Sequence, residues 1–531
     1  MLSGSLMAFV SELTNANQLT RPCTMPQLRL QLAAAIIAVA GACSAASASF
    51  DLNEATVDAI QLGFKNGTLT SKQLVLFYLD RLNPLLHGVI EVNPDALAQA
   101  ERADAERRRS PFRCGHPLHG VPVLLKDNIA TRDRLNTTAG SLALLGSVAR
   151  RDAGVVARLR AAGAVILGKA NPTEWSAFRP TPNGWSARGG QTLSPYVLST
   201  DPCGSSSGSA EAAAANMAAV TLGTETDGSI LCPSSLNSVV GIKPTVGLTS
   251  RAGVIPISPR QDTIGPMCRT VSDAVHVLDA IVGYDALDAE ATGAASKYIP
   301  NDGYGQFLRM DGLKGKRIGI PNGFFTEEIY GKKQLRVYQK HIALIRKHGA
   351  MVIENIGIAK NLTEVQNVLF SNEHTAMLAE FKQSLNAYLS DLLYSPVGSL
   401  ADIIAFNKAH PVEERLKDFG RPYFIEAENT NGIGPVAKAA IQLLNKLSDD
   451  GLEELMKKNQ LDAIVTPNND GRVFFAIGGM PAITVPAGYD DQGVPFGICF
   501  GGLKGYEPRL IEMAYAFEQA TKVRRMPSFK H

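Results

Sequence analysis

The chain has 531 residues, of which 45% are hydrophobic and 19% charged, and its formal net charge is +2. This length suffices for one large domain or two to three average ones, and the composition is globular rather than disordered. The near-neutral charge and the lack of a long basic stripe exclude a nucleic-acid-binding protein.

The N-terminal segment predicts a targeting signal. Residues 28–42 read LRLQLAAAIIAVAGA, and Ala46-Ser47-Ala48 fits an A-x-A cleavage site. The apolar run is short for a membrane span, so no stable anchor is expected. We expect residues 1–48 to be an N-terminal extension with a signal peptide and residues 49–531 to be the folded domain. A secretory route is expected, with a cytoplasmic location as the alternative.

Cysteine and histidine usage gives no sign of a metal site or a disulfide scaffold. Removal of the presequence leaves five cysteines, which are Cys114, Cys203, Cys232, Cys268 and Cys499. Their odd number and spacing predict mostly buried free thiols, although a secretory route permits a disulfide. No H-E-x-x-H motif, phosphate-binding loop or dinucleotide fingerprint occurs, so neither a metal nor a cofactor is expected.

The first part of the folded domain begins with helices and then alternates between helices and short apolar strands. We expect helices over residues 52–64, 71–82, 95–109, 152–162, 210–217 and 273–282. Strands are expected over residues 120–126, 164–167, 218–222 and 241–243.

The alternation continues after residue 315, interrupted by one helix-rich segment. Strands are expected over 316–320, 351–356, 463–466, 483–485 and 496–500, and helices over 334–347 and 510–521. Residues from about 357 to 450 lack strand signals and predict a helical insertion that covers one side of the sheet. The whole pattern predicts a single α/β domain with a mixed, largely parallel central sheet and helices on both faces.

Three segments carry side chains suited to nucleophilic catalysis without histidine. Ser205 lies in Cys203-Gly-Ser-Ser-Ser-Gly-Ser209, and Ser229 follows in Gly223-Thr-Glu-Thr-Asp-Gly-Ser-Ile230. Lys126 ends the apolar run of residues 120–126. A serine hydroxyl needs a base, and a lysine serves as one when burial keeps it neutral. A second serine can relay the proton because a hydroxyl both donates and accepts.

These motifs resemble those of the amidase signature family. Their order and the 24-residue spacing between Ser205 and Ser229 are typical of that family. The segments over residues 183–191, 203–209 and 223–229 resemble the peptide-amidase-like branch most closely. The resemblance extends from about residue 55 to 525 and implies the amidase-signature fold and hydrolysis of a small-molecule or peptide amide without a cofactor.

The resemblance implies a role for each residue. Ser229 matches the nucleophile, Ser205 the bridging serine after a cis peptide bond, and Lys126 the base. The backbone N–H groups of residues 226–229, which are Thr226, Asp227, Gly228 and Ser229, match the oxyanion hole. Ser206 is a candidate for contact with the substrate. The expected reaction converts a carboxamide to a carboxylate and ammonia or an amine through an acyl-enzyme.

Two departures from the common family pattern bear on these expectations. Asp227-Gly228 stands where many members have Gly-Gly, a change that the peptide-amidase-like branch shares. Leu231 stands where many members have arginine, which favours neutral or apolar acyl groups.

Trp175, Phe178, Trp185 and Arg188 are expected either to pack in the core or to line the substrate cleft.

Three alternatives remain open. The chain could be the glutaminase-type subunit of an amidotransferase, which shares the triad but needs partner subunits. It could also be a non-catalytic binding protein of the same shape. Finally, Gly204-Ser-Ser-Ser-Gly208 fits a G-x-S-x-G nucleophile elbow with Ser206 at its centre, although no strand signal precedes it.

Overall fold

The central feature of the fold is a mixed β-sheet. The computed structural model describes residues 50–110, 115–358 and 362–529, and within them one sheet has 11 strands in the order β1-β3-β2-β6-β8-β7-β12-β13-β11-β9-β10. The strands are β1 (Val89–Val92), β2 (Pro122–Lys126), β3 (Val165–Ala170), β6 (Val220–Glu225), β7 (Val240–Lys243), β8 (Thr263–Cys268), β9 (Arg317–Pro321), β10 (Met351–Ile356), β11 (Ala463–Pro467), β12 (Ala482–Tyr489) and β13 (Pro495–Gly501). The expected signal segment lies outside the described residues.

Parallel pairing is confined to two groups of strands. β3, β2 and β6 are mutually parallel neighbours, and so are β11, β9 and β10. The expected parallel pairing is therefore present in these two groups. Between them, the strands are paired antiparallel throughout, in the order β6-β8-β7-β12-β13-β11. The difference follows from the connections, because β12 and β13 are joined by a short turn rather than by a crossover helix.

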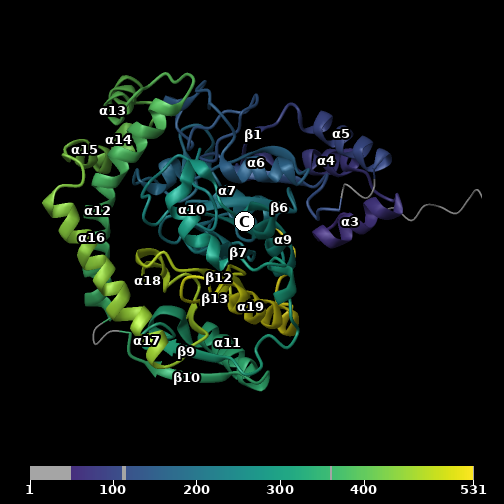
Figure 1. Ribbon diagram of the computed structural model, residues 1–531, viewed down its shortest axis with the longest axis vertical. Coiled ribbons are helices and arrows are strands. Elements are labelled where there is room, and N and C mark those ends of the chain that lie inside the picture. The colour runs from purple at the N-terminus through teal and green to yellow at the C-terminus, as the bar shows by residue number, and fades with distance from the viewer. Residues whose placement is uncertain (1–49, 111–114, 359–361, 530–531) are drawn as a thin grey trace, which may run out of the picture. The chain divides into compact units, whose positions relative to one another are not determined.

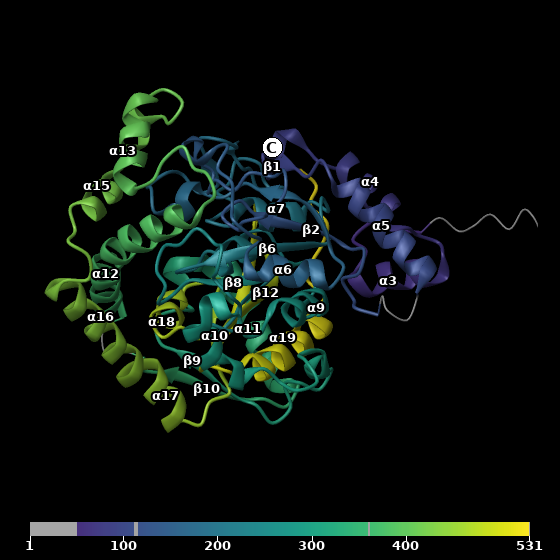
Figure 2. The ribbon, with the colours of Figure 1, turned by 45° about the horizontal axis from the view of Figure 1, so that its top comes forward.

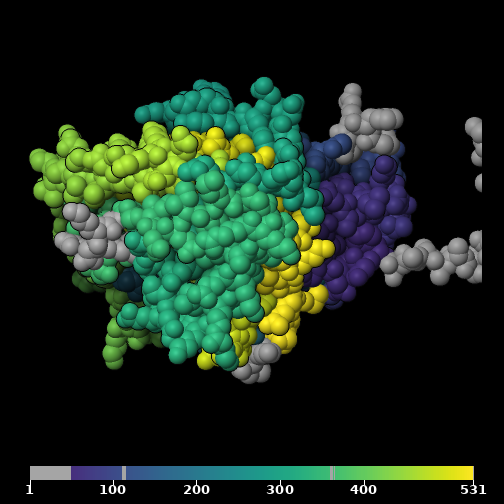
Figure 3. Space-filling model, turned by 90° about the horizontal axis from the view of Figure 1, so that it is seen from below, coloured from purple at the N-terminus to yellow at the C-terminus, as the bar shows by residue number. Residues whose placement is uncertain are grey.

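Helices cover both faces of the sheet (Figures 1 and 2). α7 (Ser207–Ala214) and α8 (Leu231–Leu236) pack together on one side, and α6 (Gly154–Ala161), α9 (Val271–Ile281) and α19 (Glu507–Thr521) pack together on the other. α11 (Glu327–Lys347) connects β9 to β10, and this region forms the middle of the face in Figure 3. The remaining helices of this part are α3 (Val57–Asn66), α4 (Ser71–Asp80), α5 (Ala96–Arg109), α10 (Ala289–Ala295) and α18 (Arg472–Ile477).

Local sequence signals explain the first helices. Thr70 and Gln73 form a capping box at the start of α4, and Gly67 ends α3 with φ of 69°. Gly67 therefore separates α3 from α4, and α3 begins five residues later than the helix expected over residues 52–64.

The segment between β10 and β11 is built from helices. They are α12 (Leu362–Asp391), α13 (Leu400–Ala409), α14 (Leu416–Phe419), α15 (Pro422–Glu428), α16 (Pro435–Leu447) and α17 (Glu454–Lys458), and in Figures 1 and 2 they form an arc along one side. A buried ion cluster ties this arc to the core, because the guanidinium of Arg179 contacts Glu174 at 2.8 Å and Glu414 at 2.7 Å. All three side chains are fully buried.

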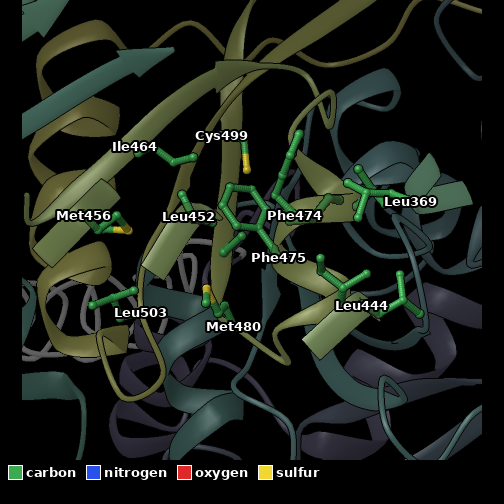
Figure 4. Close-up of a cluster of buried hydrophobic side chains, with 14 of the residues drawn as sticks. Leu369, Leu444, Leu452, Met456, Ile464, Phe474, Phe475, Met480, Cys499 and Leu503 are labelled. Atoms are coloured by element: carbon green, nitrogen blue, oxygen red, sulfur yellow. The ribbon is translucent and has the colours of Figure 1, made fainter. Parts of the chain in front are cut away.

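One apolar cluster connects the helical arc, the sheet and α18. It includes Leu369 of α12, Leu444 of α16, Phe475 of α18 and Cys499 of β13 (Figure 4). Because its members come from segments far apart in the sequence, it fixes α12 and α18 against the same end of the sheet.

Candidate active site

The candidate residues meet at the carboxyl ends of two neighbouring parallel strands. Lys126 is the last residue of β2, and Glu225 is the last residue of β6, which pairs with β2. Parallel strands end at the same edge of a sheet, so Lys126 lies beside the turn that leads from β6 to Ser229. The serine loop reaches this edge because α7, which follows it, packs against β6 and β2.

Lys126 is fully buried and bonded on several sides. Its Nζ donates to Ser205 Oγ at 2.7 Å and to Thr224 Oγ1 at 2.9 Å. Asn128 Nδ2 donates to the same Thr224 Oγ1 at 3.0 Å. Thr224 lies in the motif of Ser229 and Asn128 lies two residues after Lys126, but neither residue type signals chemistry by itself, so the sequence assigned them no role.

Burial controls the protonation of Lys126. Loss of hydration lowers the pKa of its amine to about 7, although Asp262 and Glu225 both oppose this shift. A substantial fraction of the amine is therefore neutral at neutral pH. A neutral amine can accept a proton from a hydroxyl, and Ser205 is the hydroxyl at hydrogen-bond distance.

The serine loop is buried and tied down by its neighbours. The Gly204–Ser205 peptide bond is cis, and the carbonyl of Ser205 accepts from Thr173 N at 2.9 Å. Ser206 is fully buried, and its hydroxyl donates to Thr224 O at 3.1 Å and accepts from Thr224 N at 3.2 Å. Both bonds hold the loop to β6, so the Ser206 hydroxyl is engaged with the backbone rather than directed at a ligand.

Ser229 is also buried but, unlike Lys126 and Ser205, it keeps a small exposed fraction. It is 8% exposed, whereas Lys126 and Ser205 are 0% exposed. Its carbonyl accepts from Ser206 N at 3.2 Å, which places the turn against the serine loop. No described side chain or backbone group forms a hydrogen bond with the Ser229 hydroxyl. The structure therefore brings two of the three candidate residues, Lys126 and Ser205, into direct contact, and the third, Ser229, has a hydroxyl without a partner in the described part of the chain.

The turn before Ser229 presents unused backbone donors. Among the described residues, no group accepts from the N–H of Asp227, Gly228 or Ser229. Gly228 has φ of +84°, and a Cβ there would lie 2.4 Å from Arg472 Cδ, so only glycine fits. The hydroxyl of Thr226 donates to Asp262 Oδ1 at 2.6 Å, which anchors the start of the turn.

A disulfide joins the two serine segments. Cys203, two residues before Ser205, is bonded to Cys232, three residues after Ser229. The expectation of mostly free thiols is wrong for this pair and holds for Cys268 and Cys499, which are free and buried. Sequence could not reveal the pairing, because the fold alone brings positions 29 residues apart together.

A cavity of about 370 Å³ is lined by Thr224, whose hydroxyl accepts from Lys126 Nζ, although Lys126, Ser205 and Ser229 are not among its lining residues. Thr224 and Thr226 line one end, residues 251–257 form one wall, and Tyr388 of α12 belongs to the opposite wall. Val254, Ile255 and Ile257 contribute apolar surface. The helical arc thus forms part of the wall of this cavity.

Several side chains considered for the cleft are in the core instead. Leu231 is fully buried in the same apolar cluster as Phe475 and Cys499, and it does not line the cavity, so the structure gives the specificity drawn from it no support. Trp175 and Phe178 pack against Phe381 and Phe424 in a second apolar cluster. Arg188 pairs with Glu91 and lies 3.4 Å from Asp127.

Neither a metal-binding cluster nor a membrane-spanning helix occurs within the described residues. No group of three or more His, Cys, Asp and Glu side chains there is arranged to hold a metal ion. No helix in that part of the chain is both long and apolar enough to cross a membrane.

Comparisons with known proteins agree on one family. The family model described as Amidase matches residues 73–472. A probable amidase of Arabidopsis thaliana is 58% identical over 488 residues, covering 91% of this chain and 93% of that protein. The structure of native peptide amidase from Stenotrophomonas maltophilia is 43% identical with a TM-score of 0.84, covering 91% of this chain and 100% of that chain. One subunit of the glutamyl-tRNA(Gln) amidotransferase of Microcystis aeruginosa is 31% identical over 494 residues, covering 87% of this chain and 97% of that protein.

Proposed function

Because the chain belongs to the amidase family, whose members hydrolyse amide bonds, we propose that it does so with Ser229 as nucleophile, Ser205 as proton relay and Lys126 as base. The observation that carries this assignment is the 2.7 Å contact between Lys126 Nζ and Ser205 Oγ in a fully buried site. Burial keeps the amine partly neutral, and Ser229, which is slightly exposed, lies next to the serine loop.

The proposed reaction proceeds in two halves. Ser229 Oγ attacks the amide carbon and gives its proton to Ser205 Oγ, while the Ser205 proton passes to Lys126 Nζ. The proton then returns through Ser205 to the leaving nitrogen, which departs as ammonia or an amine. Water attacks the acyl-enzyme by the same proton route and releases the carboxylate.

Besides an activated nucleophile, acyl transfer requires an oxyanion hole, and the turn between β6 and α8 is suited to form one. The carbonyl oxygen gains negative charge in the tetrahedral intermediate, and preorganised N–H groups stabilise that charge. Asp227, Gly228 and Ser229 offer three consecutive N–H groups without an acceptor among the described residues. The backbone N–H of Thr226, also expected in this hole, has no acceptor among the described residues either, and the Thr226 hydroxyl donates to Asp262 Oδ1.

The substrate is proposed to be a small-molecule or peptide amide with an apolar acyl group. The support is the apolar wall of the cavity at Val254, Ile255 and Ile257. The similar structure from Stenotrophomonas maltophilia is that of a peptide amidase, which agrees with an acyl group larger than a small aliphatic one.

A fluorophosphonate probe tests the nucleophile, because it reacts covalently with an activated serine. We expect the wild-type protein to be labelled and Ser229→Ala to lose both labelling and amide hydrolysis. Ser206→Ala is the matched control, since its hydroxyl contacts only the backbone of Thr224. Undiminished labelling of Ser229→Ala would refute the assignment, and loss confined to Ser206→Ala would support the elbow alternative.

The similarity to a subunit of an amidotransferase supports a second candidate function, that of a glutaminase-type subunit. A glutaminase-type subunit would form a stable complex and use glutamine as its amide. We expect the purified chain to hydrolyse amides by itself. Co-purification of stable partners, with hydrolysis only of glutamine, would favour the amidotransferase role, and absence of any labelled serine would favour a non-catalytic binding protein.

A further inference from the structure

A buried glutamine contacts the turn that leads to Ser229 from outside the motifs. Gln261 lies in the loop before β8 and is fully buried. Its Nε2 donates to the backbone carbonyl of Thr226 at 3.3 Å and also to the carboxyl of Glu373. Glu373 is on α12, so one side-chain amide connects the helical arc to the turn.

The bond to Thr226 fixes the direction of the next backbone N–H. In a trans peptide unit the carbonyl of one residue and the N–H of the following residue point in opposite directions. Gln261 holds the carbonyl of Thr226 on its own side, so the N–H of Asp227 points away from Gln261. That N–H has no acceptor among the described residues.

The other side of the turn is held separately. Arg472 Nε lies 3.4 Å from Asp227 Oδ2, and the arginine stem packs against Gly228. The Asp227 side chain and the Gly228 position are therefore fixed by α18, whereas the Thr226–Asp227 peptide plane depends on Gln261. Rotation of that plane would cost the Gln261 bond and turn a carbonyl oxygen toward the developing oxyanion.

We propose that Gln261, held by Glu373, is a positioning residue that orients the Asp227 N–H of the oxyanion hole. The proposal rests on the assignment of Ser229 as nucleophile. It assigns a role in the chemical step to α12, a helix that otherwise packs in two apolar clusters and lines the cavity. Gln261 itself does not touch the substrate in this scheme.

The protonation state of the Glu373 carboxyl determines which substitutions are informative. Burial and the neighbouring Asp227 raise the pKa of Glu373 to about 8, so its carboxyl is largely protonated at neutral pH. Glu373→Gln is then a neutral mimic that still accepts from Gln261, whereas Glu373→Leu removes the acceptor. Gln261→Glu keeps the shape but removes the Nε2 donor.

The experiment measures kcat, KM and the affinity for a trifluoromethyl ketone, which forms a tetrahedral adduct with an active-site serine. Loss of one oxyanion-hole donor lowers kcat by about 10²–10³-fold, and misdirection of a donor is expected to cost about 10- to 100-fold. We expect Gln261→Glu and Glu373→Leu to lower kcat and ketone affinity by such factors, with KM changed less than about threefold. Glu373→Gln should stay within about threefold of wild type in all three quantities.

Controls separate positioning from folding and from the nucleophile assignment. Glu380→Gln changes the same residue type on the same helix, but its carboxyl contacts Ser258 and Arg260 rather than Gln261. It should leave kcat unchanged. Unaltered kcat and ketone affinity in Gln261→Glu and Glu373→Leu, or equal losses in Glu373→Gln, would overturn the positioning role. A Ser229→Ala protein that is still labelled by the fluorophosphonate would instead overturn the underlying function.

Discussion

Lys126 shows how tertiary contacts turn an ordinary residue into a candidate base. Lysine side chains are rarely buried without a partner, and here the partners are hydroxyl and carbonyl groups of Ser205 and Thr224 rather than a carboxylate. Neutral partners solvate the amine without holding its proton. This explains why desolvation dominates and the pKa falls to about 7.

The pH dependence of hydrolysis follows from this value. The neutral amine is the active form. The neutral fraction is about one half at a pH of about 7, falls at lower pH and rises toward one at higher pH. We expect kcat/KM to fall about tenfold per pH unit below that value and to level off above it. A pH–rate profile between pH 5 and 9 measures this, and constant kcat/KM down to pH 5 would contradict the neutral-lysine base.

At the residue level, the structure has Lys126 Nζ and Ser205 Oγ 2.7 Å apart, which agrees with the relay that the family resemblance implies. Their catalytic roles stay a proposal. Gln261 and Asp262 could not be recognised in this way. They lie more than 30 positions after Ser229 in a loop, and only the pairing of β6 with β8 brings that loop to the turn.

At the scale of elements, the Cys203–Cys232 disulfide connects the serine loop to the start of α8. Both ends of this connection lie within three residues of a serine assigned to the triad. The disulfide therefore restricts how far the loop before α7 can move from the turn before α8. It supplements the single backbone bond between Ser206 and Ser229.

Removal of the disulfide should destabilise the protein. A cross-link that closes a loop of about 30 residues stabilises a fold by roughly 3–4 kcal/mol, mainly by restricting the unfolded chain. We expect Cys203→Ser/Cys232→Ser to lower the free energy of unfolding by this amount, as measured by urea denaturation. Reductant should destabilise the wild-type protein and leave the double variant unchanged. Equal thiol counts in the denatured protein before and after reduction would show that the bond does not form.

The helical arc illustrates what element prediction can and cannot give. A helix-rich stretch near 357–450 was evident from its polar composition and lack of strand signals. Its attachment was not, because Leu369 and Phe475 join one cluster only after the chain has returned through α18. The strand β8 also escaped prediction, since Gly265 and Pro266 interrupt its apolar pattern.

For the whole molecule, the remaining question is the compartment in which it works. The disulfide supports the proposal of a secretory route, because disulfides persist in oxidising compartments and are rare in the cytosol. The signal that would direct this route lies in residues 1–48, outside the described residues.

Targeting can be measured directly. Residues 1–48 fused to a fluorescent protein should direct it into the secretory pathway and be removed near Ala48, because the apolar run and the A-x-A site lie within this segment. A fusion lacking residues 28–42 is the control and should remain in the cytosol. Cytosolic fluorescence from the complete fusion would contradict the proposed route.

The sequence by itself determined the α/β class, the helical segment and the motifs that carry the amidase resemblance. These follow from local periodicity and from residues at fixed spacing. Only the tertiary structure decided the Cys203–Cys232 pairing, the antiparallel centre of the sheet and the contact of Gln261 with Thr226. The physical reason is that such contacts depend on which strands become neighbours, and burial then sets the pKa of Lys126 through groups remote in sequence.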